Sequence, residues 1–185
     1  MDRIEVFSNR VHGIALKAEE FEPRIPEIIE PNIKSFAKVA AYCLEEMDKF
    51  LLMENETDDD VLKYMNDTAK LAQLGMLGYK YAIGGETTLT RIANQMVDTY
   101  KRKNADYGDS FGASLDKYGP VAAHVRMSDK INRLQTLVVR KQTVQVKDES
   151  IADTFLDLAC YAIMRLVYIE MKSAELDEEK EVADE

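Results

Sequence analysis

Residues 149–171 read ESIADTFLDLACYAIMRLVYIEM, and this stretch decides the fold that we expect for the chain. Each residue advances a helix by about 100°, which gathers apolar residues into one broad arc: Ile151, Phe155, Leu158, Ala159, Ala162, Leu166 and Ile169. A second side becomes apolar toward the end of the stretch, at Cys160, Met164, Val167 and Met171. A helix with apolar residues on two faces packs against neighbours on both, so the stretch predicts an enclosed helix.

The head of that second side carries three acidic residues, Glu149, Asp153 and Asp157, one helical turn apart. Because the same side is apolar further along, we expect the three carboxylates to be partly buried. Carboxylates this close lose hydration and repel one another unless a cation or protons compensate, and stacked oxygen ligands suit Mg²⁺ or Mn²⁺. The alternative is a solvated acidic first turn, which the helix dipole favours. This alternative explains Asp148 and Glu149 well, but it explains Asp153 and Asp157 poorly because they lie beyond the first turn.

Most of the remaining chain also has helical periodicity. Apolar residues recur at intervals of three and four in further segments at 33–53, 60–82, 88–103 and 121–140. Asp148 can cap a last long helix from Glu149 to about Leu176, and the acidic tail 175–185 is expected to be frayed. The patterns together predict an all-α fold.

Three segments have no helical prediction. Residues 1–32 stay unassigned because the prolines among them limit continuous helix. Residues 104–119 are rich in Gly, Asp and Ser and are predicted to form a loop. Residues 141–147 alternate in a way that is compatible with an extended strand.

Length and charge limit the classes of function. With 185 residues and 46% hydrophobic content, the chain can form one compact domain, or one domain with a helical extension. Its net charge of -10 repels phosphate backbones, so we do not expect general nucleic-acid binding. A small nucleotide bridged by a divalent cation stays compatible with this charge, because the metal inverts the local sign.

Cysteine usage and the absence of sorting signals indicate the compartment. Cys43 and Cys160 lie in apolar helical contexts, so we expect reduced core thiols and no disulfide or zinc site. No basic-then-apolar leader and no long uncharged apolar run occurs in the sequence. The sequence therefore predicts a soluble protein of the cytoplasm without membrane contact.

The segment 121–140 carries a polar stripe opposite its apolar side. Arg126, Asp129, Lys130 and Arg133 project to this stripe. One interpretation is a solvated face with ion pairs three or four residues apart. The other makes Asp129 a fourth carboxylate near a metal and the cations groups that hold phosphate oxygens. The residues alone leave both open.

The segment 103–111, KNADYGDSF, combines a cation, two aromatic residues and a glycine. It is compatible with stacking of a base and binding of a phosphate, since Gly108 permits unusual backbone angles. The alternative is a plain connection between helices whose aromatic residues, Tyr107 and Phe111, pack on the core. No known phosphate-loop pattern is present.

Three motifs in this order resemble a phage and bacterial family called nucleotide modification associated domain 1. They are KNADYGDSF at 103–111, RMSDKINR at 126–133 and DESIADTFLDLACY at 148–161. The resemblance covers roughly Leu89 to Tyr168, and the family looks related to the MazG-like, all-α nucleotide pyrophosphatases. It implies a helical bundle, completed by a second subunit, in which carboxylates from two helices hold magnesium. It also implies hydrolysis of a nucleoside triphosphate to a monophosphate and pyrophosphate.

The resemblance implies roles for individual residues. The metal ligands are Asp129, Glu149, Asp153 and Asp157, with Glu149 and Asp129 acting in catalysis. The residues expected to bind substrate are Lys103, Tyr107, Phe111, Arg126, Lys130, Asn132 and Arg133. The family pattern has Glu-x-x-Glu on one helix and Glu-x-x-Asp on the next, whereas this chain has Asn132 in place of an acid and acids spaced by four on the second helix. This departure puts efficient catalysis in doubt.

The sequence leaves three kinds of function open and divides the chain into three parts. We expect a helical extension at 1–86, a nucleotide- and metal-binding domain at 87–174 and an acidic tail at 175–185. The first function is a Mg²⁺-dependent nucleotide pyrophosphohydrolase, active as a homo-oligomer. The second is a non-catalytic nucleotide-binding protein or an accessory of DNA modification, and the third is a helical partner-binding protein.

Overall fold

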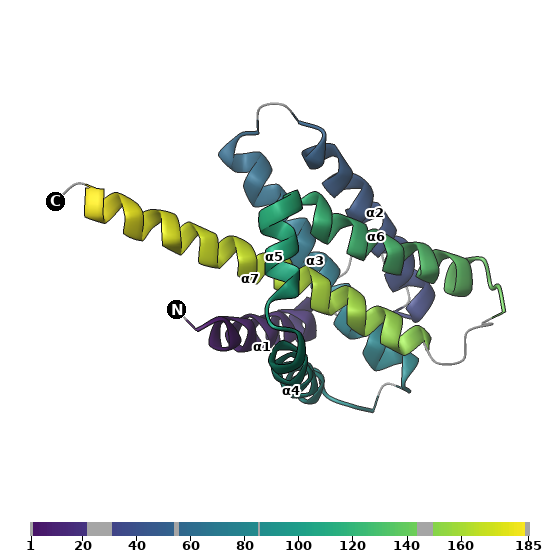
Figure 1. Ribbon diagram of the computed structural model, residues 1–185. Coiled ribbons are helices and arrows are strands. Elements are labelled where there is room, and N and C mark those ends of the chain that lie inside the picture. The colour runs from purple at the N-terminus through teal and green to yellow at the C-terminus, as the bar shows by residue number, and fades with distance from the viewer. Residues whose placement is uncertain (1, 22–30, 54–55, 85, 144–149, 184–185) are drawn as a thin grey trace.

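The computed structural model is helical throughout its regular elements (Figure 1). It describes residues 2–21, 31–53, 56–84, 86–143 and 150–183. The helices are α1 (Arg3–Phe21), α2 (Ile33–Leu51), α3 (Asp58–Ala82), α4 (Leu89–Tyr107), α5 (Ser110–Tyr118), α6 (Val121–Leu134), the π-helical turn η2 (Gln135–Val139) and α7 (Ile151–Ala183). These ranges contain no strand, which confirms the predicted all-α fold.

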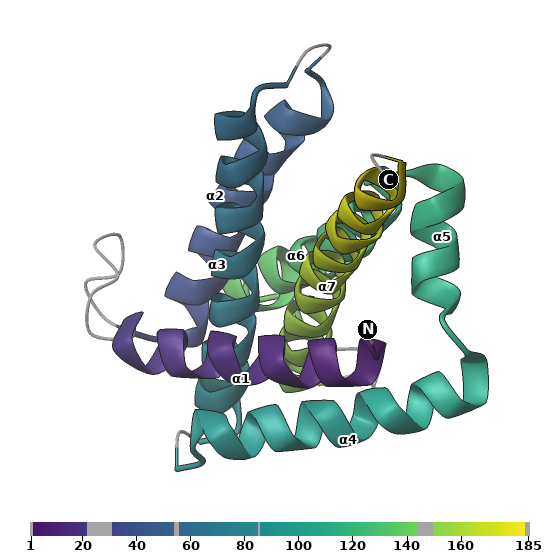
Figure 2. The same ribbon diagram turned by 90° about the vertical axis from the view of Figure 1, so that its left-hand side faces the viewer.

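The helices α3 and α7 pack closely at the centre of the molecule (Figure 2). Two glycines of α3 allow this approach. A Cβ atom at Gly75 would lie 2.8 Å from the Cβ of Ala159, and one at Gly78 would overlap the ring of Phe155. Both apolar sides of α7 are packed as predicted, with Phe155 and Leu158 on one and Val167 on the other almost fully buried.

The other helices cover this central pair. α2 packs against α3 and α6, and α6 also packs against α7. α1 contacts α3 and α7 and lies alongside α4 (Figure 2). One continuous core therefore includes buried residues from Val6 in α1 to Val167 in α7, so the first 86 residues share their core with the rest of the chain.

The unassigned segment 1–32 contains a long helix, α1. Its prolines, Pro23, Pro26 and Pro31, all follow the end of α1 at Phe21, so none of them interrupts this helix. The signal was present in the sequence, because the buried residues of α1 recur at intervals of three and four: Val6, Phe7, Val11, Ile14, Ala15 and Ala18.

The predicted loop at 104–119 is wrong. α4 continues to Tyr107, the chain turns at Gly108 and Asp109, and α5 begins at Ser110. Gly108 has a φ of 61°, the left-handed region that favours glycine. Asp109 caps α5 by accepting a hydrogen bond from the backbone N–H of Gly112 at 3.1 Å. The polar residues thus mark a sharp corner between two helices.

Two further boundaries differ from expectation. The last helix does not end near Leu176, because α7 continues to Ala183. The acidic tail is therefore helical where it is described. Residues 141–143 form no regular structure, and the remainder of the segment predicted to be extended, 144–147, lies outside the described residues. No helix in the described ranges combines the length and the apolar character needed to span a membrane.

Candidate functional site

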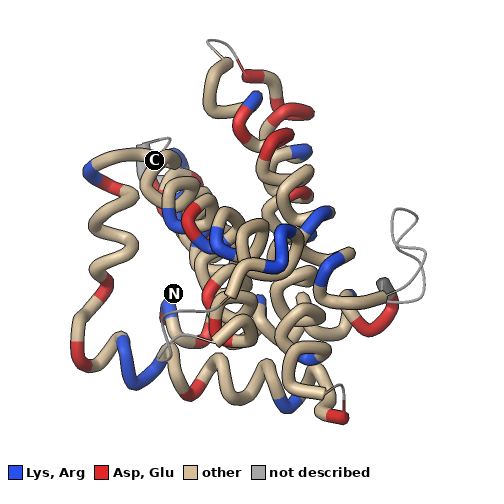
Figure 3. Tube along the Cα trace, turned by 90° about the vertical axis from the view of Figure 1, so that its right-hand side faces the viewer, with Lys and Arg blue, Asp and Glu red and all other residues tan. Residues whose placement is uncertain are grey.

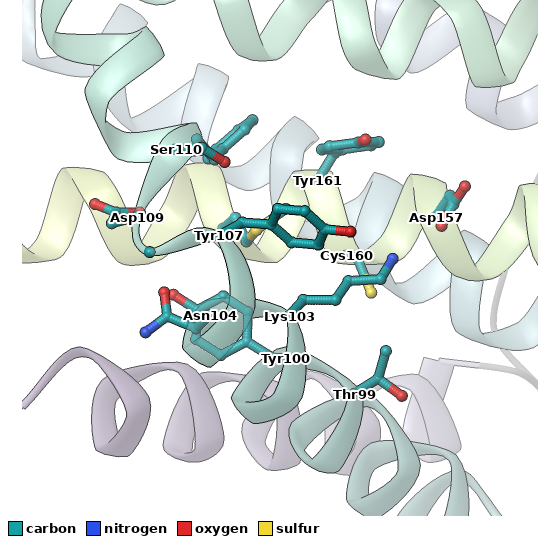
Figure 4. Close-up of a pocket in the computed structure, with 13 residues that line it drawn as sticks. Thr99, Tyr100, Lys103, Asn104, Tyr107, Asp109, Ser110, Asp157, Cys160 and Tyr161 are labelled. Carbon is teal, nitrogen blue, oxygen red and sulfur yellow. The ribbon is translucent and has the colours of Figure 1, made fainter.

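A cavity of about 180 Å³ lies between the C-terminal half of α4, the α4–α5 corner and the first half of α7 (Figure 4). Helical spacing explains its walls. Tyr100, Lys103 and Tyr107 follow one another at intervals of three and four along one face of α4, and Asp157 and Tyr161 are four apart on α7. The cavity therefore forms where the side chains of two helix faces meet.

Aromatic rings form much of the cavity wall. The rings of Phe111 and Tyr161 lie with their centroids 5.8 Å apart. Tyr100 stacks on Phe7 of α1 with centroids 3.9 Å apart, and burial raises the pKa of its hydroxyl. Tyr107 is 74% exposed at the rim. A flat ring can therefore enter the cavity and contact aromatic faces.

The end of the cavity nearest the start of α7 is charged. Asp157 lines it and forms an ion pair with Lys130 of α6, with 2.9 Å between Nζ and Oδ2. Lys103 extends from α4 toward α7 (Figure 4). Burial, and next the charge of Asp157, raise the pKa of the Cys160 thiol to about 12, while Lys103 lowers it. Cys160 therefore stays protonated at neutral pH and is not a thiolate nucleophile.

The two described members of the predicted carboxylate column, Asp153 and Asp157, do not form a buried cluster. Asp153 is exposed, and it forms a capping box with Ser150: the Ser150 backbone N–H donates to Asp153 Oδ2 at 3.1 Å, and the Asp153 backbone N–H donates to the Ser150 hydroxyl at 3.0 Å. The expectation of partial burial is wrong for Asp153 because α7 begins at Ile151, which puts this residue in the solvated first turn. Asp157 is half-buried, with 37% of its side chain exposed.

The described residues do not by themselves fit a metal centre. Asp129 is exposed on α6, and Glu149 lies outside the described residues. Among the residues that the structure describes, no group of three or more His, Cys, Asp or Glu side chains could hold a metal ion. Asp157 is also engaged by Lys130, so a cation there would compete with an existing ion pair.

The predicted substrate residues are divided between several places. Lys103, Tyr107 and Phe111 line the cavity, and Lys130 reaches its edge through Asp157. Arg126 lines a neighbouring open groove of about 510 Å³, which shares Phe111 and Tyr161 with the cavity.

Two other residues of α6 form hydrogen bonds outside the cavity. Arg133 Nε donates to Thr154 Oγ1 at 3.1 Å and so joins α6 to α7. Exposed Asn132 donates to Ser128 Oγ at 3.4 Å. Neither is among the residues that line the cavity.

Sequence reasoning missed Tyr100 and Tyr161, which line the cavity beside the predicted residues. Their spacing was a usable signal, because Tyr100 precedes Lys103 by three residues and Tyr161 follows Asp157 by four. In the backbone tube of Figure 3, several basic positions lie near the middle of the view, and acidic positions lie at separate places around them.

The fold and the cavity define an all-helical protein with an aromatic cavity that is charged at one end. Residues 103–169 match the model of the family nucleotide modification associated domain 1, which confirms the resemblance seen in the three motifs. The match begins at Lys103 and includes all the cavity residues from there to Met164, whereas Thr99 and Tyr100 precede it. No curated protein and no solved structure matches the chain.

Proposed function

We propose that this protein binds a nucleotide in the cavity between α4 and α7. The observation that supports this most directly is the arrangement of the cavity, which combines aromatic walls with a lysine and an acidic residue at one end. Small-molecule sites in proteins typically have such a largely apolar lining with a few convergent polar groups. The family match over the same residues supports the same class of ligand.

Each part of the cavity suits one part of a nucleotide. The base lies against Tyr107, Phe111 and Tyr161, because aromatic faces attract flat rings with few constraints on their hydrogen-bonding edges. The phosphates lie toward the ammonium groups of Lys103 and Lys130, which supply charge-assisted hydrogen bonds. Both cations are therefore needed for the affinity of a phosphorylated ligand over a nucleoside.

Nucleotide hydrolysis is the second candidate function. It is favoured by the contact between Lys130 and Asp157, which brings the acid-bearing stripe of α6 next to that of α7. In this version the protein is related to the MazG-like pyrophosphohydrolases and releases pyrophosphate from a nucleoside triphosphate with Mg²⁺ or Mn²⁺. Because the described acids do not form a complete metal site, the remaining ligands come from Glu149 or from a second copy in a homo-oligomer.

The test is calorimetric titration with nucleoside mono-, di- and triphosphates, with and without Mg²⁺. Lys103→Ala is expected to weaken binding by about tenfold or more, since a hydrogen bond to a charged group contributes roughly 1.5–3 kcal/mol. Lys101→Ala is the matched control, because Lys101 is an exposed lysine of the same helix that does not line the cavity. Equal losses in the two variants would contradict the assignment of Lys103.

The same samples separate the candidate functions. Tight binding without pyrophosphate release supports the binding protein, and Mg²⁺-dependent release supports the hydrolase. If no common nucleotide binds or raises the melting temperature, both are rejected. A helical partner-binding protein is then the remaining interpretation.

A further inference from the structure

The helix α1 lies outside the segment that matches the family, yet it contacts the cavity at two places. Arg3 forms an ion pair with Asp109, the residue that caps α5 at the α4–α5 corner. One turn further along α1, Phe7 stacks on Tyr100 with an interplanar angle of 12°. Both Asp109 and Tyr100 line the cavity.

We propose that α1 is the positioning element of the cavity, with Arg3 holding the α4–α5 corner closed and Phe7 holding the Tyr100 wall in place. The inference rests on the proposed nucleotide binding for its ligand, but the contacts between α1 and the corner are independent of it. It gives the N-terminal part of the chain a role in the site.

The corner needs such a support because few backbone bonds cross it. Only Gly108 and Asp109 lie between α4 and α5, and Gly108 has a positive φ. Gly108 N–H donates to Asn104 within α4, whereas Asp109 caps α5 through Gly112. The two helices are therefore joined here by a short turn, and Arg3 binds the acidic residue of that turn from a third helix.

Gly112 shows how closely the pieces of the corner fit. A Cβ atom at this position would lie 2.7 Å from Cγ of Asp109 and would also collide with Nη1 of Arg3. A methyl group at this place inside α5 would therefore displace the ends of the Asp109 and Arg3 side chains. Gly112→Ala offers a way to separate them without removing any charge.

The second contact places Tyr100 by packing. Phe7 is fully buried and Tyr100 half-buried, so the stacked pair excludes water from the inner side of the wall. In Figure 4 the ribbon of α1 runs beneath α4 on the side where Tyr100 lies. A base in the cavity then meets a wall whose position is fixed from behind.

The experiment compares Arg3→Ala, Arg3→Lys and Arg10→Ala in the full chain by nucleotide calorimetry and by amide hydrogen exchange of residues 108–113. Arg3→Ala is expected to weaken binding about threefold, the scale of a partly exposed ion pair, and to accelerate exchange at the corner. Arg3→Lys keeps the cation and restores both. Arg10→Ala is the matched control, because it breaks the ion pair of the same helix with Glu170 of α7, away from the corner.

Gly112→Ala is expected to change binding and exchange in the same directions as Arg3→Ala. The proposal is overturned if Arg3→Ala leaves affinity and exchange as in the unmodified chain, or if Arg10→Ala changes them equally. If the unmodified chain binds no nucleotide, the proposed function fails, and hydrogen exchange decides alone. Faster exchange at 108–113 in Arg3→Ala but not in Arg10→Ala then supports the role of α1, and unchanged exchange overturns it.

Discussion

Lys130 of α6 and Asp157 of α7 form an ion pair in which Nζ lies 2.9 Å from Oδ2, at the edge of the aromatic cavity. A residue expected to bind phosphate and a residue expected to bind metal thus neutralise each other in this structure. What happens to this pair when a ligand enters determines how the site works.

Replacing Asp157 by Asn distinguishes nucleotide binding without a metal ion from nucleotide binding through Mg²⁺. Without Mg²⁺, we expect Asp157→Asn to bind a nucleoside triphosphate about fivefold more tightly, because it removes a charge that repels phosphate; two unit charges about 4 Å apart in water interact by ~1 kcal/mol. With Mg²⁺, we expect the variant to lose any metal-dependent gain in affinity. Calorimetry measures both. Weaker binding without metal would show that the ligand's phosphates do not lie near Asp157.

Asp153 is expected to act as a helix cap. Asp153→Ala removes the two hydrogen bonds that its carboxylate accepts from Ser150, one from the backbone N–H and one from the hydroxyl. It should lower the free energy of unfolding by about 0.5–1.5 kcal/mol. The loss should be the same with and without Mg²⁺, because a cap does not depend on the metal. Urea denaturation in the two buffers measures it. A loss confined to the Mg²⁺ buffer would instead make Asp153 a metal ligand.

The packing of α3 on α7 depends on Gly75. We expect Gly75→Ala to destabilise the protein by about 1–3 kcal/mol, because the added methyl group lies 2.8 Å from Ala159 and the helices must move apart. Gly13→Ala in α1 is the matched control, since no atom lies within 4 Å of its new Cβ. It should stabilise the protein by up to about 1 kcal/mol through helix propensity. If the denaturation midpoint falls in both variants, close packing of α3 against α7 at Gly75 does not explain the loss of stability.

The Cys160 thiol predicts a stability change at alkaline pH. Burial raises its pKa to about 12 in the folded protein, against an ordinary value of 9.0 for a cysteine thiol. Between these two values the unfolded chain loses the proton and the folded one keeps it, so stability falls as pH rises from about 9 toward 12. The contribution is fully present below pH 9. The free energy of unfolding, measured by urea denaturation at several pH values, should therefore fall more steeply over this range for the unmodified chain than for Cys160→Ala.

Alkylation of Cys160 provides a second measurement of the same property. At pH 9, iodoacetamide should modify this thiol much more slowly in the folded protein than in urea, because the thiolate is the reactive form. Peptide mapping distinguishes it from Cys43, which is also a free cysteine. Equal rates in the folded and unfolded states would contradict the burial of the thiol.

Local sequence patterns predicted much of the fold and part of the site. The two apolar sides of α7 follow from the helical period, and Phe155 and Val167 are buried accordingly. Lys103, Tyr107 and Phe111 were expected to surround a ligand, and all three line one cavity. The helix α1 was detectable from its own spacing, although its neighbouring prolines obscured it.

The spacing of the acidic residues did not predict their different surroundings in the structure. Asp153 and Asp157 are four residues apart, yet one caps the helix in solvent and the other contacts Lys130. This difference depends on where α7 begins and on how α6 crosses it.

The sequence by itself determined most of the helices, their buried sides and the family resemblance, because periodicity and backbone geometry act over a few neighbouring residues. Only the tertiary structure decided that Asp157 meets Lys130, that Tyr100 and Tyr161 face one cavity and that Arg3 reaches Asp109. Those pairs lie on different helices, and their distances depend on helix crossings set by the packing of the whole core, such as the close approach at Gly75.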